Sequence, residues 1–124
     1  MPTEPAPVTL AELARLAAEI VDPADSDSDV ADFEQAFEDA DEPARALLDG
    51  ALDERVAEVE RRIDPEGDLP QIAMAAAVVR YLAHKRTETG DDREAILRLS
   101  ARAEFAGDPP PVVADWLVDQ GVTV

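Results

Sequence analysis

The most hydrophobic segment of the chain, Gln71–Ala83, has almost no polar face. Apolar side chains fill the uninterrupted run Ile72–Val79, which ends at Arg80. A helix that is apolar on all sides must be covered on all sides, and this run is far shorter than the ~20 residues that span a bilayer. The pattern therefore predicts a central core helix over residues 69–86, whose four alanines let neighbouring helices approach closely.

Five further segments carry apolar residues at the three- and four-residue spacing of a helix. Asp22-Pro23 stops the first of them, and Val8 is placed to pack on Leu13 at its start. The predicted apolar faces are, in chain order, Leu10, Leu13, Ala14, Ala17, Ile20 and Val21; Val30, Phe33, Phe37 and Ala40; Leu48, Leu52, Val56, Val59 and Ile63; Ile96, Leu97, Leu99 and Ala103; and Val112, Val113, Trp116 and Leu117.

Polar residues predict where these helices begin. Thr9 and Glu12 have the spacing of a capping box. The third helix opens at Asp41-Glu42-Pro43, and its apolar stripe continues past Gly50, so we expect one long helix with a weak point. Asp64-Pro65-Glu66-Gly67 has the residue preferences of a type I turn. The expected N-terminal caps of the other helices are Ser28 or Asp29, Asp68, Asp91 and Asp108, the last with Pro109 and Pro110 in the first turn.

No segment alternates as a strand does, and no internal repeat is present. The sequence thus predicts an all-α domain of about six helices spanning residues 9–124, behind a flexible tail of residues 1–8 that holds three prolines. The length suffices for one core without disulfide bonds.

The net charge of the chain is the bulk property that says most about its possible partners. The chain has 29 acidic and 11 basic residues, a formal net charge of −18, and only one of the bases is lysine. Such a surface repels nucleic acids and anionic lipids at long range. A halophilic-type surface, adapted to a salt-rich cytoplasm, explains the acidity without a special function. The absence of cysteine and of an apolar leader favours a cytoplasmic protein.

The sequence offers no catalytic, cofactor-binding or metal-binding motif. His84 is the only histidine, which excludes a two-histidine metal site. Carboxylates alternate over Asp25–Asp29 as in a calcium loop, but Val30 and Ala36 stand where that loop needs glycine and glutamate. We therefore expect a protein that is not an enzyme and carries no cofactor.

The charges are unevenly distributed along the chain. Residues 1–64 hold nineteen acids and five arginines, whereas residues 65–124 hold ten acids and six bases. The six bases form an island: Arg80, Lys85, Arg86, Arg93, Arg98 and Arg102. This island either faces the acidic helix around Phe33–Asp41 within the molecule or binds an acidic partner.

The end of the chain has the spacing of a helix-turn-helix, with Ala103 and Gly107 ahead of Val113 and Trp116. Its second helix, however, presents prolines and aspartates and no base, which would meet DNA phosphates with the wrong sign.

We therefore expect a small helical adaptor or regulatory protein that binds another protein. The candidate contact residues are Arg80, Lys85, Arg86, Arg93, Arg98, Arg102, Val112 and Trp116. The alternative is a helix-turn-helix transcriptional regulator, or an acidic DNA mimic or antitoxin-type inhibitor of a DNA-binding partner. Nucleic acid and membrane are disfavoured as partners, and self-association is left open.

Overall fold

The computed structural model describes residues 9–39, 50–84 and 93–122. Within these ranges the chain forms six helices and no strand, which confirms the all-α prediction. The helices are α1 (Leu10–Val21), α2 (Ser28–Ala36), α3 (Ala51–Ile63), α4 (Pro70–His84), α5 (Arg93–Phe105) and α6 (Pro111–Asp119). None of these helices is long and apolar enough to cross a membrane.

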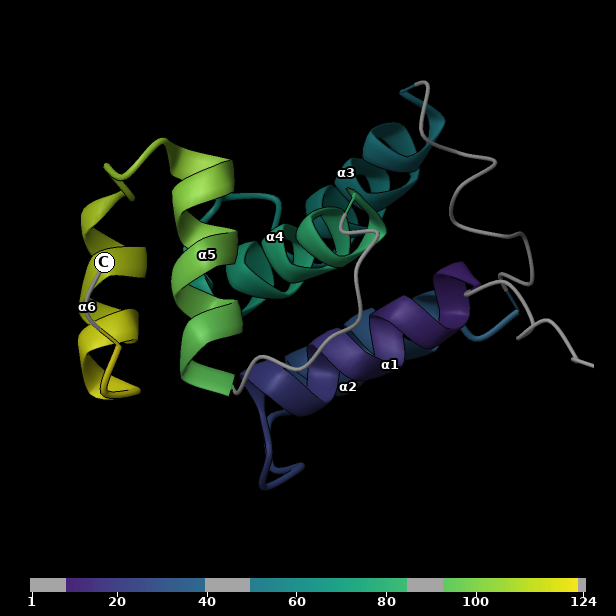
Figure 1. Cartoon of the computed structure of the whole chain (residues 1–124). Helices are drawn as coiled ribbons and strands as arrows, with labels where there is room; N and C mark the ends of the chain where they lie inside the picture. The colour runs from purple at the N-terminus through teal and green to yellow at the C-terminus, as the bar shows by residue number, and fades with distance from the viewer. Residues whose placement is uncertain (1–8, 40–49, 85–92, 123–124) are drawn as a thin grey trace, which may run out of the picture.

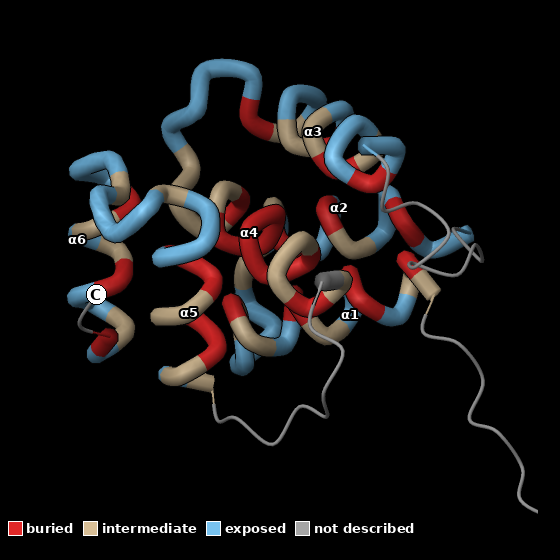
Figure 2. Tube along the Cα trace, turned by 45° about the horizontal axis from the view of Figure 1, so that its top comes forward, coloured by how far each residue is buried: buried red, intermediate tan, exposed pale blue. Residues whose placement is uncertain are grey.

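Helix α4 runs through the middle of the bundle and packs against each of the other five helices (Figure 1). The segment Met74–Val79 is buried at every position, and Ala75, Ala76 and Ala77 are at most 1% exposed. Figure 2 shows this buried stretch surrounded by the inward faces of the other helices. Small side chains allow helix axes to come close, which explains how one helix can contact five neighbours.

Helix α1 begins where the sequence predicts. The Thr9 hydroxyl accepts a hydrogen bond from the Glu12 backbone N–H at 3.1 Å, so Thr9 is the N-terminal cap. The predicted contact of Val8 with Leu13 lies outside the described residues, because the description begins at Thr9.

Helix α2 is capped one residue earlier than expected. The Asp27 carboxylate accepts hydrogen bonds from the backbone N–H groups of Asp29 at 2.9 Å and Val30 at 3.2 Å. The prediction of Ser28 or Asp29 was therefore wrong, since both already lie inside the helix. Farther along the same segment, Phe33 and Phe37 are buried, with ring centroids 5.2 Å apart. Ala40, predicted on the same face, is outside the described residues.

The prediction that the third helix continues through Gly50 is wrong. Gly50 has φ +95° and ψ −21°, a left-handed conformation, and α3 begins at the next residue. A right-handed helix requires φ near about −63°, so no helix can pass through this residue. Leu52, Val56 and Val59 do form the predicted buried face of α3, whereas Leu48 and the expected start at Asp41 lie outside the described residues.

Two Asp-Pro turns join α1 to α2 and α3 to α4 in the same way. Asp22 and Asp64 are C-terminal caps with nearly equal backbone angles, φ −134° and −131° and ψ 71° and 68°. Each carboxylate also accepts hydrogen bonds from backbone N–H groups just ahead of the next helix. Asp22 accepts from the Asp27 N–H at 2.8 Å, and Asp64 accepts from the N–H groups of Asp68 at 2.8 Å and Leu69 at 3.0 Å.

This turn also corrects the predicted cap of the central helix. Asp68 was expected to cap α4, but the helix begins at Pro70, and Asp68 itself donates its N–H to the Asp64 carboxylate. The predicted type I turn is consistent with the Gly67 N–H donating to the Asp64 carbonyl at 3.2 Å.

Helices α5 and α6 lie side by side at one end of the molecule (Figures 1 and 2). Helix α6 begins at Pro111 with Pro110 as its cap, so the predicted cap at Asp108 was two residues too early. Its last turn is closed by the Val122 N–H, which donates to the Leu117 carbonyl at 2.9 Å and leaves Val122 buried. The expected cap of α5 at Asp91 lies outside the described residues.

Candidate functional site

Arg80 contacts more side chains than any other described residue of the predicted basic island. It lies on α4 with only 18% of its side chain exposed. The guanidinium contacts three carboxylates: Asp53 at 3.4 Å and Glu60 at 3.7 Å, both on α3, and Glu104 on α5 at 2.9 Å. We call this cluster the Arg80 junction, and it is part of the bundle rather than a free binding surface.

Burial raises the pKa of Glu60 above the usual range of a glutamate. The nearby Arg80 acts in the opposite direction, while Glu104 and Asp64 raise the pKa further and Arg61 lowers it. The effect of burial dominates because Arg80 is shared among three carboxylates and lies 3.7 Å from Glu60.

Arg93 is also used within the molecule. Its Nε donates to the Ile20 carbonyl at the end of α1 at 2.6 Å, and its NH2 group donates to the Gln120 side-chain oxygen at the end of α6 at 2.7 Å. A single guanidinium thus joins the first and last helices to α5. Like Arg80, it is therefore not available to a partner.

Arg80 and Arg93 are both used within the molecule, but the partners described above do not belong to the acidic helix around Phe33–Asp41 that the island was expected to face. The acids around Arg80 come from α3 and α5, not from the segment around Phe33–Asp41. Lys85 and Arg86 lie outside the described residues, as does the side chain of His84.

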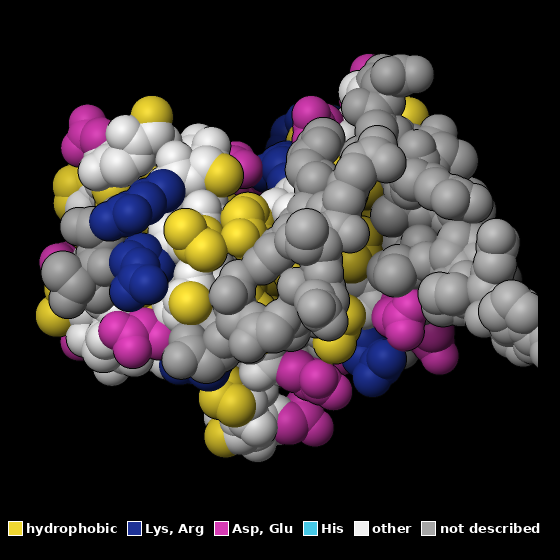
Figure 3. Space-filling model, viewed as in Figure 1, with side chains coloured by type: hydrophobic (Ala, Val, Ile, Leu, Met, Phe, Trp, Pro, Cys, Tyr) yellow, Lys and Arg dark blue, Asp and Glu magenta, His cyan; other side chains and the backbone are white. Residues whose placement is uncertain are grey.

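Arg98 and Arg102 differ from the other two described bases of the island. They lie one turn apart on α5, on the side away from the buried residues Leu97 and Ala101. Arg102 is exposed and Arg98 half-buried. No described acid lies within ion-pair distance of either one. Figure 3 shows basic side chains on the α5–α6 side of the molecule, with apolar side chains next to them.

The predicted apolar face of α6 is divided between the core and the surface. Val113 and Leu117 are buried. Val112 is 40% exposed, which corrects its expected place in the core, and Trp116 is half-buried one turn farther on. We use the name α5–α6 surface for five residues of these two helices that are not buried: Arg98, Leu99 and Arg102 on α5, and Val112 and Trp116 on α6.

The helix-turn-helix spacing does not produce the packing that such a motif needs. Ala103, expected to pack the first helix against the turn, is exposed. Helices α5 and α6 are each packed on α4 more extensively than on each other. The connection is a turn in which Ala106 and Gly107 both have positive φ.

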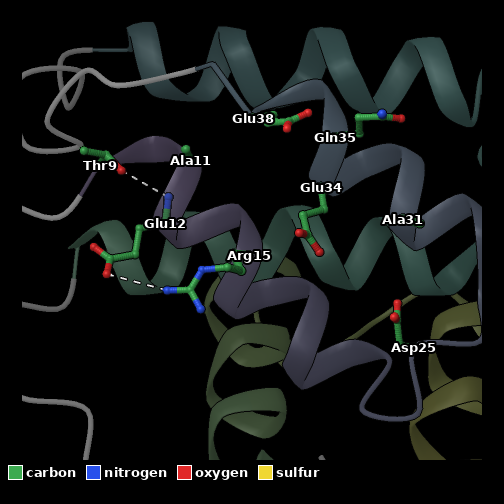
Figure 4. A pocket seen from close by; sticks show the side chains of 9 residues that line it. All are labelled: Thr9, Ala11, Glu12, Arg15, Asp25, Ala31, Glu34, Gln35 and Glu38. Atoms are coloured by element: carbon green, nitrogen blue, oxygen red, sulfur yellow. Dashed lines mark hydrogen bonds and ion pairs between the residues drawn. The ribbon is translucent and has the colours of Figure 1, made fainter.

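An acidic groove between α1 and α2 was not anticipated from the sequence. It has a volume of about 670 Å³. Figure 4 shows carboxylates around it, contributed by both helices and the loop between them, with Arg15 paired to Glu12 at 3.8 Å on one wall. The groove is lined by Thr9, Ala11, Glu12, Arg15, Asp25, Ala31, Glu34, Gln35 and Glu38.

Several acids line the groove, but nothing in its geometry selects a ligand. Across residues 9–39, 50–84 and 93–122, no three histidine, cysteine or acidic side chains are grouped so as to hold a metal ion. No match to the chain was found among protein-family models, curated proteins or solved structures.

Proposed function

We propose that this protein is a small acidic adaptor that binds another protein through the α5–α6 surface and catalyses no reaction. The observation that carries the proposal is the contrast between the arginines. Arg80 contacts three carboxylates, whereas Arg98 and Arg102 contact none among the described residues. In a chain with 29 acids and 11 bases, two neighbouring arginines with no acidic partner among the described residues are a basic site that this part of the molecule leaves open.

The chemistry of this surface indicates the kind of partner. Two guanidinium groups one helical turn apart match carboxylates with the same spacing, and arginine can bind each carboxylate through two hydrogen bonds. Val112 and Trp116 on the neighbouring helix add apolar area, and tryptophan and arginine are the residues most enriched at protein interfaces. The surface therefore fits an amphipathic helix that carries an acidic pair next to apolar side chains.

Nucleic acid fits this surface less well. The two arginines are surrounded by a molecule of net charge −18, which repels a polyanion over a distance set by the salt concentration. A partner helix with a few carboxylates meets less of this repulsion than a duplex with two charges per base pair, and it can also bury apolar surface.

Capture from the native cytoplasm at its native salt, followed by direct binding of the purified captured protein, tests the proposal. Trp116 is the only tryptophan, so its fluorescence reports binding at this surface. The double variant Arg98→Glu, Arg102→Glu should abolish capture and the fluorescence change. A matched control is Arg15→Glu, Arg62→Glu, which makes the same change in net charge at two arginines that are more than half exposed.

The apolar half of the surface has its own pair of variants. Val112→Ser should weaken binding several-fold, whereas Val118→Ser, at a 71% exposed position of the same helix, should leave it unchanged. Equal loss of capture in both arginine double variants would contradict the proposal. Salt-sensitive binding of duplex DNA that disappears in Arg98→Glu, Arg102→Glu would favour the DNA-binding alternative. Self-association that disappears in the same double variant would mean that the partner is a second copy of this chain.

A further inference from the structure

The Arg80 junction joins three helices through one side chain, as Arg93 also does, but the partners of Arg80 described above are all carboxylates. Helices α3 and α5 both pack on α4, and neither packs extensively on the other. The guanidinium of Arg80 bridges them by contacting Asp53 and Glu60 on one side and Glu104 on the other. The junction therefore transmits any change in its charge to the packing of both helices.

The charges of the junction do not balance. Three ionised carboxylates and one guanidinium leave two excess negative charges within a few ångströms. Glu60 and Glu104 are 30% and 28% exposed, whereas Asp53 is 62% exposed and better screened by water. Arg61 and Asp64 on α3 complete the set of charged groups that act on Glu60. Neutralising one of the less exposed carboxylates would relieve the repulsion while leaving Arg80 paired.

We propose that the Arg80 junction is a proton-sensitive link between α3 and α5, in which Glu60 takes up a proton as the pH falls and the three helices hold together more firmly. The link stands apart from the proposed function, because none of its carboxylates belongs to the α5–α6 surface. Glu60 is the acceptor, since Glu104 makes the short, hydrogen-bonded contact with Arg80 at 2.9 Å, while Glu60 lies 3.7 Å away.

The raised pKa of Glu60 determines how the stability of the protein changes with pH. Burial raises the pKa of Glu60 in the folded state above its value in the unfolded chain. The folded state then binds the proton more tightly, so this group's contribution to stability is fully present below the unfolded pKa and is lost as the pH rises through the folded pKa. Glu60→Gln removes this dependence, because the amide carries no charge at any pH.

Carbon-13 NMR titration of the glutamate carboxyl groups in the wild-type protein is the first measurement. Glu60 should titrate at higher pH than the glutamate of a short unstructured peptide. Glu66, an exposed residue in the turn before α4, supplies the matched control for the variants. The second measurement is the melting temperature of Glu60→Gln and of the matched control Glu66→Gln, which makes the same change in net charge. At pH 7, Glu60→Gln should melt higher than Glu66→Gln by about 2 °C or more, and this difference should vanish as the pH falls below the titration of Glu60.

Hydrogen exchange localises the effect. Amides of α3 and α5 should gain protection in Glu60→Gln at pH 7 relative to Glu66→Gln, beyond any gain in α1. If Glu60 titrates as the glutamate of an unstructured peptide does, the link does not exist. The proposal is equally overturned if the two variants melt at the same temperature at pH 7, or if the added protection is uniform over all helices.

Discussion

At the scale of single residues, the surroundings of an arginine decide what it does. Arg80 and Arg98 lie on two helices that pack together, yet the first contacts three carboxylates and the second contacts no described acid. The difference is one of position, because Arg80 lies within reach of acids on both α3 and α5. The two residues should therefore respond very differently to replacement by a neutral side chain of similar length.

Replacing Arg80 with methionine should lower the free energy of unfolding by about 2 kcal/mol. This is below the ~3–5 kcal/mol typical of breaking a fully buried pair, because the carboxylates around Arg80 remain partly hydrated. Arg98→Met should change it by about 0.5 kcal/mol or less. Urea denaturation of both variants measures the contrast, and equal losses would show that the junction contributes nothing to stability.

The hydroxyl of Ser100 differs from the guanidinium of Arg80 in having no partner among the described residues. This hydroxyl is fully buried, and no hydrogen-bonding partner for it is found among the described residues. Ser100→Ala should raise the free energy of unfolding by about 1 kcal/mol, because burying an unsatisfied hydroxyl is costly. Ala101→Ser, at an equally buried neighbour, should lower it by a similar amount. A clear loss of stability in Ser100→Ala would mean that the hydroxyl is bonded.

At the scale of helices and turns, the ends of elements decide the path of the chain. The two Asp-Pro turns use one carboxylate both to end a helix and to bind the backbone of the next segment. Gly50 fixes the start of α3 through a left-handed conformation. Both features are local, and both can be tested by single substitutions.

Gly50→Ala should lower the free energy of unfolding by about 1 kcal/mol, because a Cβ atom is disfavoured at positive φ. An added Cβ would meet no atom within 4 Å, so the loss reports backbone strain alone. The sign of the change in the free energy of unfolding distinguishes the two conformations of Gly50. In the middle of a continuous helix, alanine would instead raise the free energy of unfolding by about the same amount. Gly50→Asn should lose less than Gly50→Ala, because asparagine tolerates the left-handed region better. Thermal melting of the three proteins gives the order.

Asp64→Ala should cost about 2 kcal/mol, because it leaves two backbone N–H groups without their acceptor at a residue that is only 7% exposed. Asp68→Ala, at the exposed residue first expected to be the cap, should cost about 0.5 kcal/mol or less. Chemical denaturation compares the two, and a larger loss in Asp68→Ala would restore the original assignment of the cap.

At the scale of the whole molecule, the net charge of −18 acts against the compact state. Salt shortens the Debye length from about 10 Å at 0.1 M to about 3 Å at 1 M, so self-repulsion should weaken. The melting temperature should rise between these concentrations of potassium chloride, despite some weakening of exposed ion pairs such as Arg62–Glu58. An unchanged melting temperature would argue against salt adaptation as the reason for the acidic surface.

The sequence alone determined the class of fold and the place of each helix. Periodic apolar residues and local caps act over three to five positions, so Thr9 and Asp22-Pro23 mark the ends of α1 before any tertiary contact is known. The errors at α2, α4 and α6 were shifts of one or two residues, because several aspartates or prolines lie near each helix end and the backbone geometry selects one of them. Gly50 was misjudged because an apolar stripe shows periodicity but not the sign of φ.

Only the tertiary structure decided which charged residues are engaged. The contacts of Arg80 with Glu104 and of Arg93 with Ile20 join residues 24 and 73 positions apart, and they depend on how helices cross around α4. In the sequence, Arg80, Arg93, Arg98 and Arg102 are equivalent members of one basic island. The crossing of α3, α4 and α5 places acids beside Arg80 and leaves Arg98 and Arg102 outside, because an ion pair is set by distances in space that helical periodicity does not encode.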